Sequence, residues 1–431
     1  MKNYIKILTV ITLIVSVITG CSGKETIDDT IKNEITTTTA TTATTTSSGE
    51  YSEQNEPNVP NNTLDTSIFD NITFDKPVTQ LNVNQNTFLH SEIGGYINNK
   101  IYLIKTGENF DTNQKFYFYN TNNGETQLIQ TVPDFSIYGT NSCAVGNYIF
   151  TMTQSGTDYI CIATDITDNS SYEMYRGTEV YEENENELYA ESFRYLHSVN
   201  ATQFIEYWVD FNLYNYNKNV HIKLGNVTTV NNEPEIQFTE INTENIQSLL
   251  GNRNLLYGTV ANDNKIYFLT SKDITVSDLT LYTFDLNGNL LLTDNLDIVD
   301  NFTAELENKE VRKFNIVGNI LTINFHNSKQ LVVKLTDGLT SEIIFDNLEY
   351  QKPIHSTNSN NFVLFEKTYA EDYSVEGYGY LDHYKVYLYN SQSGQLTGLV
   401  EGDFTWVIAN DEKLVYGTST GECYSVSLFN N

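Results

Sequence analysis

The chain has 431 residues, with 55 acidic against 24 basic side chains and a formal net charge of −31 at pH 7. So acidic a surface repels phosphate backbones and anionic lipid head groups, and we therefore expect no nucleic-acid partner. Aromatic residues make up 13% of the chain, with 30 Tyr and 22 Phe, and this richness favours strands over helices.

The N-terminus has the pattern of an export signal. Two lysines flank the start of an apolar run over residues 7–18, which is shorter than the about 20 residues of a membrane-spanning helix. The run leads into ITGC, ending at Cys21, which resembles the lipobox of bacterial lipoproteins. The resemblance implies a signal peptide over residues 1–20 and lipidation of Cys21, with anchorage on the extracytoplasmic face of the cell membrane. A plain secretory signal with an incidental cysteine is the alternative.

The segment after the cysteine offers little to bury. Residues 21–65 include TTTTATTATTTSSGE and NEPNVPNN, and such a composition cannot offset the entropy lost on ordering. Fully extended, its roughly 40 residues reach about 140 Å. We predict a disordered tether over residues 21–65, and a folded body over residues 66–431.

The body repeats an aromatic strand, a glycine turn and an apolar strand, as in KFYFYNTNNGETQLI and KVYLYNSQSGQLTGL. A spacing near 50 residues in strand-rich sequence is typical of propeller blades rather than of a sandwich. Glycine supplies the positive φ that a tight hairpin turn requires. The repeats turn at Gly124, Gly288, Gly338 and Gly394.

Seven apolar strands follow Asn- or Gly-led turns, near residues 98, 146, 200, 262, 318, 360 and 410. Taking these as second strands makes SCAV, LLYGTVA, KFNIV and FTWVIA the inner first strands. We predict an all-β fold: a single β-propeller, with seven four-stranded blades. Six or eight blades are the alternatives, because residues 176–250 are irregular. The last blade lacks a fourth strand, so we expect one near Ile68–Val83 to pair beside Cys423–Leu428 and hide the open edge.

The repeat phrases resemble those of uncharacterised bacterial lipoprotein propellers of the low-density-lipoprotein-receptor-like type, whose units read roughly G-N-x-I-Y-Y … L-Y-x-x-x-x-D-G. The resemblance covers most of residues 96–431 and implies a propeller fold. The Tyr-Trp-Thr-Asp hallmark of the receptor is absent, as are the Trp-Asp and sialidase Asp-box signatures. No ligand is therefore carried over.

Three motifs suggest chemistry and are better explained by structure. GTSTG, Gly417–Gly421, matches the nucleophile-elbow pattern, but a β segment follows and the last histidine, His383, precedes the serine. DLNGN at Asp285 begins like a calcium loop but lacks the required later glycine and acid. The six histidines form no HExxH site. We expect no metal, no cofactor and no catalytic residues.

The cysteines after the lipobox number three. Cys143 and Cys161 are predicted on the first and third strands of one blade, about 9.6 Å apart, which is too far for a disulfide. With Cys423, they are expected to be small buried hydrophobes.

Long connections between second and third strands are the predicted binding elements, since loops on a rigid scaffold often bind ligands. They span residues 105–115, 271–278 and, longest, 368–384, and the acidic link 177–192 is expected on the same face. Aromatic rings can stack on sugars while carboxylates accept hydrogen bonds, although the tyrosines could instead pack on one another. The candidate ligand-binding residues are Tyr369, Asp372, Tyr373, Tyr378, Tyr380 and Asp382.

These features predict a monomeric, membrane-anchored lipoprotein that displays a non-catalytic propeller. Its ligand would be a glycan, a peptide or an envelope protein, and neutral or cationic ligands suit the acidic charge. The alternative is a lyase or hydrolase that acts on polysaccharide, because propellers also support catalysis.

Overall fold

In the computed structural model, residues 62–431 form one compact unit. All described residues belong to this unit and begin at residue 72, so the predicted signal peptide, Cys21 and the whole predicted tether, residues 21–65, lie outside them. Among the described residues, no helix combines the length and apolar character needed to cross a membrane. The described ranges are 72–82, 91–105, 113–132, 139–155, 158–178, 182–184, 187–191, 194–212, 218–250, 255–271, 279–296, 311–325, 329–349, 355–358, 360–369, 382–418 and 421–429.

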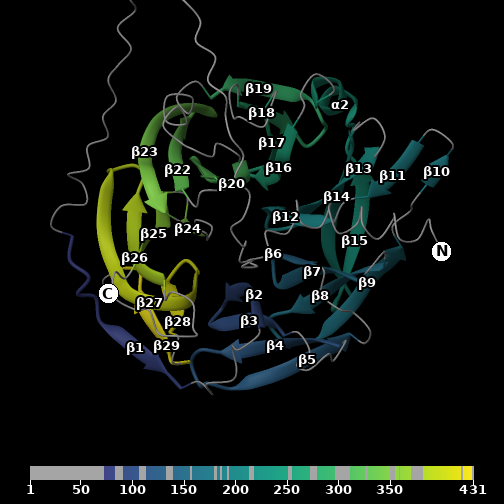
Figure 1. Cartoon of the computed structure of the whole chain (residues 1–431). Coiled ribbons are helices and arrows are strands. Elements are labelled where there is room, and N and C mark those ends of the chain that lie inside the picture. Colours follow the sequence, from purple (N-terminus) through teal and green to yellow (C-terminus); the bar gives the residue numbers. More distant parts are fainter. Residues whose placement is uncertain are drawn as a thin grey trace, which may run out of the picture. The chain divides into compact units, whose positions relative to one another are not determined.

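The described strands form six antiparallel sheets, which we number in chain order (Figure 1). The first, second, fourth and fifth sheets have four strands each. The first sheet comprises β2 (Ser91–Ile97), β3 (Lys100–Lys105), β4 (Gln114–Asn120) and β5 (Thr126–Val132). The second comprises β6 (Gly139–Val145), β7 (Tyr148–Ser155), β8 (Asp158–Asp165) and β9 (Ser171–Thr178). The fourth comprises β16 (Leu255–Asn262), β17 (Lys265–Ser271), β18 (Thr280–Asp285) and β19 (Leu290–Asn295). The fifth comprises β20 (Val311–Val317), β21 (Ile320–Phe325), β22 (Lys329–Thr336) and β23 (Leu339–Glu349).

Two sheets are larger. The third sheet has six strands: β10 (Glu182–Asn184), β11 (Glu187–Glu191), β12 (Tyr195–Asn200), β13 (Gln203–Asn212), β14 (Lys218–Val230) and β15 (Glu233–Glu240). The helix α2 (Glu244–Leu250) follows it. The closing sheet has seven strands: β24 (His355–Asn358), β25 (Asn361–Tyr369), β26 (Asp382–Asn390), β27 (Gln395–Ala409), β28 (Lys413–Thr418), β29 (Cys423–Ser427) and β1 (Val78–Leu81).

The predicted count of seven four-stranded blades is wrong, because the described strands form six sheets. The reason lies in β27, which includes the predicted first strand FTWVIA. Its first part pairs with β26 and its second part, from Phe404, pairs with β28. The chain does not break between these parts, so the final hairpin continues the preceding sheet instead of starting another.

The sheets form a single β-propeller. Strands β2, β6, β12, β16 and β20 contact one another in chain order. The fifth sheet contacts the closing sheet through β23 and β25, and β27 contacts β2, which completes the circuit. Each of the seven predicted second strands is present, as β3, β7, β13, β17, β21, β25 and β28. Their side chains are largely buried on both faces, since each sheet packs between two neighbours. Apolar clusters therefore lie between the sheets, as between the fourth and the fifth.

The turn glycines behave as predicted. Gly124, Gly288, Gly338 and Gly394 all have positive φ, between 70° and 87°. The turn at Gly288 also packs closely, because a Cβ there would lie 1.9 Å from the carbonyl oxygen of Asn242. DLNGN is confirmed as a hairpin turn: the Asp285 carboxylate accepts hydrogen bonds from the backbone N–H groups of Asn287 and Asn289.

The predicted closure by an N-terminal strand is confirmed. Val78–Leu81 pairs antiparallel with Cys423–Val426. Just upstream, the Lys76 ammonium donates to the carbonyl oxygen of Leu428 at 2.7 Å, and the Phe74 ring packs 5.4 Å from the ring of Tyr387. The first described residues of the domain therefore seal its last strands.

The cysteine prediction is also confirmed. Cys143 lies on β6 and Cys161 on β8, the first and third strands of the second sheet, and both are free and buried, as is Cys423. Burial raises the pKa of all three thiols, to about 12 for Cys423. Protonated and enclosed, they serve as packing groups.

Candidate functional site

The third sheet is the most elaborate part of the described propeller. On one side of its central strand β13, the first half pairs with β12 and the end, from Asp210, pairs with β11. The acidic link 177–192 contains two strands, β10 and β11, which extend this sheet. Glu206, Trp208 and Asp210 alternate along β13 and share one face, as strand geometry dictates.

Trp208 is covered by a buried cation. The Arg194 guanidinium carbon lies 3.9 Å from the Trp208 ring centroid and 4.2 Å from the ring of Tyr159 in the second sheet. Arg194 and Trp208 are each only 6% exposed. A desolvated cation over aromatic faces contributes on the order of 2 kcal/mol. Arg194 therefore fastens the start of β12 to the neighbouring sheet.

Glu206 neutralises this cation. Its carboxylate accepts a hydrogen bond from Arg194 Nη1 at 2.8 Å and another from the Tyr175 hydroxyl at 3.0 Å. Burial, with the neighbouring Cys161 and Glu206, raises the pKa of Tyr175 well above its usual value, so the phenol remains a donor. Because both carboxylate oxygens have donors, the charge is tolerated in the interior. These groups hold the sheets together.

A histidine and a carboxylate lie at the more open end of the same face. His221 Nε2 is 2.6 Å from Asp210 Oδ2, and the His221 ring stacks on Trp208 with centroids 4.9 Å apart and planes 10° from parallel. The His221 side chain is 40% exposed. A carboxylate so placed fixes the orientation of an imidazole, and an oriented imidazole can hydrogen-bond a ligand or move a proton.

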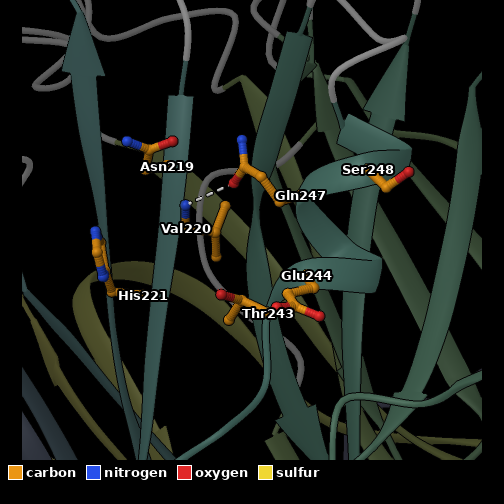
Figure 2. Close-up of a pocket in the computed structure, with 7 residues that line it drawn as sticks. All are labelled: Asn219, Val220, His221, Thr243, Glu244, Gln247 and Ser248. Atoms are coloured by element: carbon orange, nitrogen blue, oxygen red, sulfur yellow. Dashed lines mark hydrogen bonds between the residues drawn. The ribbon is translucent and has the colours of Figure 1, made fainter.

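Beside this end, a pocket of about 460 Å³ opens between β14 and α2 (Figure 2). Its volume lies within the range of about 300–1,000 Å³ for ligand sites. Most of the lining surface is apolar, with amide, hydroxyl, imidazole and carboxylate groups distributed over it. The lining residues are Asn219, Val220, His221, Thr243, Glu244, Gln247 and Ser248. Figure 2 shows Gln247 extending from α2 to the backbone of Val220, whose N–H donates to Gln247 Oε1 at 3.1 Å.

The structure tests little of the ligand site predicted from sequence. Tyr369 and Asp382 pair across the ends of β25 and β26, so the long insertion does connect a second to a third strand. Asp372, Tyr373, Tyr378 and Tyr380 lie outside the described residues, as do most of the predicted connections 105–115 and 271–278. The pocket at β14 is on a different sheet, and the sequence analysis did not identify it.

The motifs that suggested catalysis or metal binding have structural roles. The GTSTG segment joins β28 to β29 in a hairpin, and the N–H of Gly421 donates to the carbonyl of Thr418 at 3.1 Å. Within the described part of the chain, no group of three or more His, Cys, Asp or Glu residues is arranged to hold a metal ion.

One signal for the third-sheet cluster was present in the sequence. Glu206 interrupts the apolar run QFIEYWV, and a carboxylate inside a buried strand requires a cationic partner. Arg194, twelve residues earlier, could not be chosen as that partner from spacing alone. The bond between Gln247 and Val220 depends on where the chain leaves the sheet, which no local pattern specifies.

No known family model and no curated protein matches the sequence. Solved structures with a similar arrangement include an oligogalacturonate lyase in complex with manganese, with 11% identity and a TM-score of 0.45 over 83% of this chain and 97% of that one. The protein lmo1340 of Listeria monocytogenes is similar at 13% identity and a TM-score of 0.44, over 82% and 98% of the two chains. The Cps50 (Swd1) β-propeller domain of Myceliophteria thermophila is similar at 11% identity and a TM-score of 0.43, over 79% of this chain and 98% of that one. With every one of these TM-scores below 0.5, the fold assignment rests on strand pairing.

Proposed function

We propose that the protein is a lipid-anchored, extracytoplasmic binding module whose propeller holds a ligand without transforming it. The pocket between β14 and α2 is the observation that carries this proposal. Six of its seven lining residues have polar side chains, it is open to solvent, and it adjoins the buried pair of Arg194 and Glu206. A rigid scaffold of this kind lowers the entropy cost of binding.

The ligand class follows from charge. The chain carries a formal net charge of −31, and the pocket contains the exposed carboxylate of Glu244. Polyanions would be repelled, whereas neutral or cationic ligands would not. Glycans, peptides and envelope proteins remain the candidate ligands, and the long connection around Tyr373 and Tyr378 is a second candidate contact surface.

One observation favours the alternative of a polysaccharide-acting lyase or hydrolase. The carboxylate of Asp210 lies 2.6 Å from His221, an arrangement suited to general-base catalysis. The distinguishing result is product formation from a neutral or acidic polysaccharide that His221→Ala abolishes. Binding without products, in both the native chain and the variant, supports the non-catalytic module.

The anchor is tested at Cys21, the last residue of the ITGC quartet. We expect the native protein to fractionate with membranes and its mature N-terminal peptide to carry a diacylglycerol mass. Cys21→Ser should remove that mass and release the protein, because two acyl chains or more are needed for stable anchoring. A native protein that is unmodified and fully released would contradict the anchor while leaving the propeller's binding role to be tested separately.

A further inference from the structure

The edge of β14 is incomplete on the side that faces α2. Strand β15 pairs with β14 only from Lys223 onward, so residues 218–221 have a strand partner only in β13. The N–H of Ile241 makes one last ladder bond to the carbonyl of Ile222, at 3.0 Å. The chain then turns away into α2, so among the described residues no strand pairs with this short edge of β14 in the wall of the pocket.

A side chain takes the place of the missing strand. Gln247 Oε1 accepts the hydrogen bond of the Val220 N–H, as a backbone carbonyl would. In an antiparallel strand, the N–H and the carbonyl of one residue point to the same side, so the Val220 carbonyl also faces the pocket. Val220 thus presents one donor and one acceptor to the pocket, while the N–H and carbonyl groups of Asn219 and His221 face β13. An unpaired edge of this kind is a template for another extended chain. Glutamine can leave by rotation about its own side-chain bonds.

We call the pocket between β14 and α2 the slot. We propose that an extended peptide carrying a basic side chain binds in the slot and adds a short strand to β14 at Asn219–His221. The inference rests on the proposed binding function and names its ligand class. Three residues of strand span about 10 Å. The peptide would displace Gln247 from the Val220 N–H, and its basic side chain would lie against Glu244.

Charge and shape favour a peptide over a sugar. Glu244 is exposed at the slot and gives it a negative charge. The nearby cation of Lys223 does not line the slot, because its ammonium lies over the Trp208 ring, 5.2 Å from the ring centroid. Sugar sites commonly use an aromatic platform. Among the described lining residues the one ring is His221, which is already stacked on Trp208.

Calorimetric titration of the full chain tests the proposal. The probes are a short end-blocked peptide of alternating Val and Thr with a central Lys, its counterparts with central Gln or Glu, an N-methylated Lys peptide, and a neutral cellulose oligosaccharide. We expect the Lys peptide to bind about tenfold more tightly than the Glu peptide. N-methylation should abolish binding, because it removes the N–H groups of strand pairing.

Three variants locate the site. Glu244→Lys should reverse the order of the Lys and Glu peptides. Glu235→Lys, the same change at an exposed position of β15 that pairs with Thr228, should leave the order unchanged. Gln247→Ala should tighten Lys-peptide binding by about threefold or more, because the peptide no longer competes with the glutamine oxygen. A merely structural glutamine would not give tighter binding on removal.

Each remaining outcome overturns a separate claim. Equal effects of Glu244→Lys and Glu235→Lys would place the peptide elsewhere, and undiminished binding of the N-methylated peptide would exclude strand addition. Binding of the oligosaccharide alone would overturn the peptide inference and support the binding module. Binding of none of these probes would overturn the inference and count against the proposed function, unless the anchor and another ligand independently support it.

Discussion

Glu206→Ala should lower the free energy of unfolding by about 3–5 kcal/mol. The substitution removes the acceptor of both Arg194 and Tyr175 and leaves the Arg194 charge in the interior, where its side chain is 7% exposed. The loss is therefore mainly the cost of an uncompensated buried cation. Chemical denaturation of the native chain and the variant, monitored by tryptophan fluorescence, measures the difference.

An exposed ion pair provides the control. Arg176 and Glu173 lie 3.2 Å apart with side chains 53% and 46% exposed, so Glu173→Ala should cost less than about 1 kcal/mol. Replacing both buried partners, Arg194→Met with Glu206→Leu, should recover much of the loss, because no charge is left buried. If Glu206→Ala is no more costly than Glu173→Ala, the cluster does not hold the second and third sheets together.

Gly288→Ala is expected to be the second large effect, at about 2–5 kcal/mol. A left-handed backbone, here with φ of 83°, costs a non-glycine residue about 1–2 kcal/mol. The new methyl group would also meet the carbonyl oxygen of Asn242 at 1.9 Å, and overpacking adds about 1–3 kcal/mol. Asn242 directly precedes the turn into α2, so the variant should also weaken ligand binding in the slot.

Gly394→Ala separates the cost of the left-handed backbone from the cost of the clash with Asn242. Gly394 occupies the equivalent turn with φ of 70°, and nothing lies within 4 Å of a Cβ there. Its substitution should cost only the backbone term and leave the slot unchanged. Equal thermal denaturation midpoints for the two variants would mean that contact between the Gly288 turn and Asn242 adds nothing to stability.

The repeated elements were predictable because local chemistry specifies them. Glycine turns and apolar strands of alternating burial appear wherever the sequence shows them, including the strand that begins after Asn410. The sheet count was not predictable in the same way. FTWVIA looks like a separate first strand, but β27 pairs with β26 through Asp403 and with β28 from Phe404, so one strand continues from one pairing to the next.

The candidate site depended on contacts between distant residues. Glu206 indicated a buried charge, yet its partners Arg194 and Tyr175 come from different segments and become neighbours only when the second and third sheets pack. The open edge of β14 arises where β15 ends at Glu240. An eight-residue strand that stops short of its neighbour has no sequence signature, and beyond it Ile246 of α2 packs in the same apolar cluster as Val220 and Ile222.

Hydrogen–deuterium exchange of the full chain, with and without the Lys peptide, tests the location of binding most directly. We expect slower exchange on peptide addition in the segments covering Asn219–His221 and α2, with little change in β5, a fourth strand of another sheet. Glu244→Lys should remove that protection. Protection confined to the connection at residues 370–381, or an unchanged exchange pattern despite saturating peptide, would contradict binding at the third sheet.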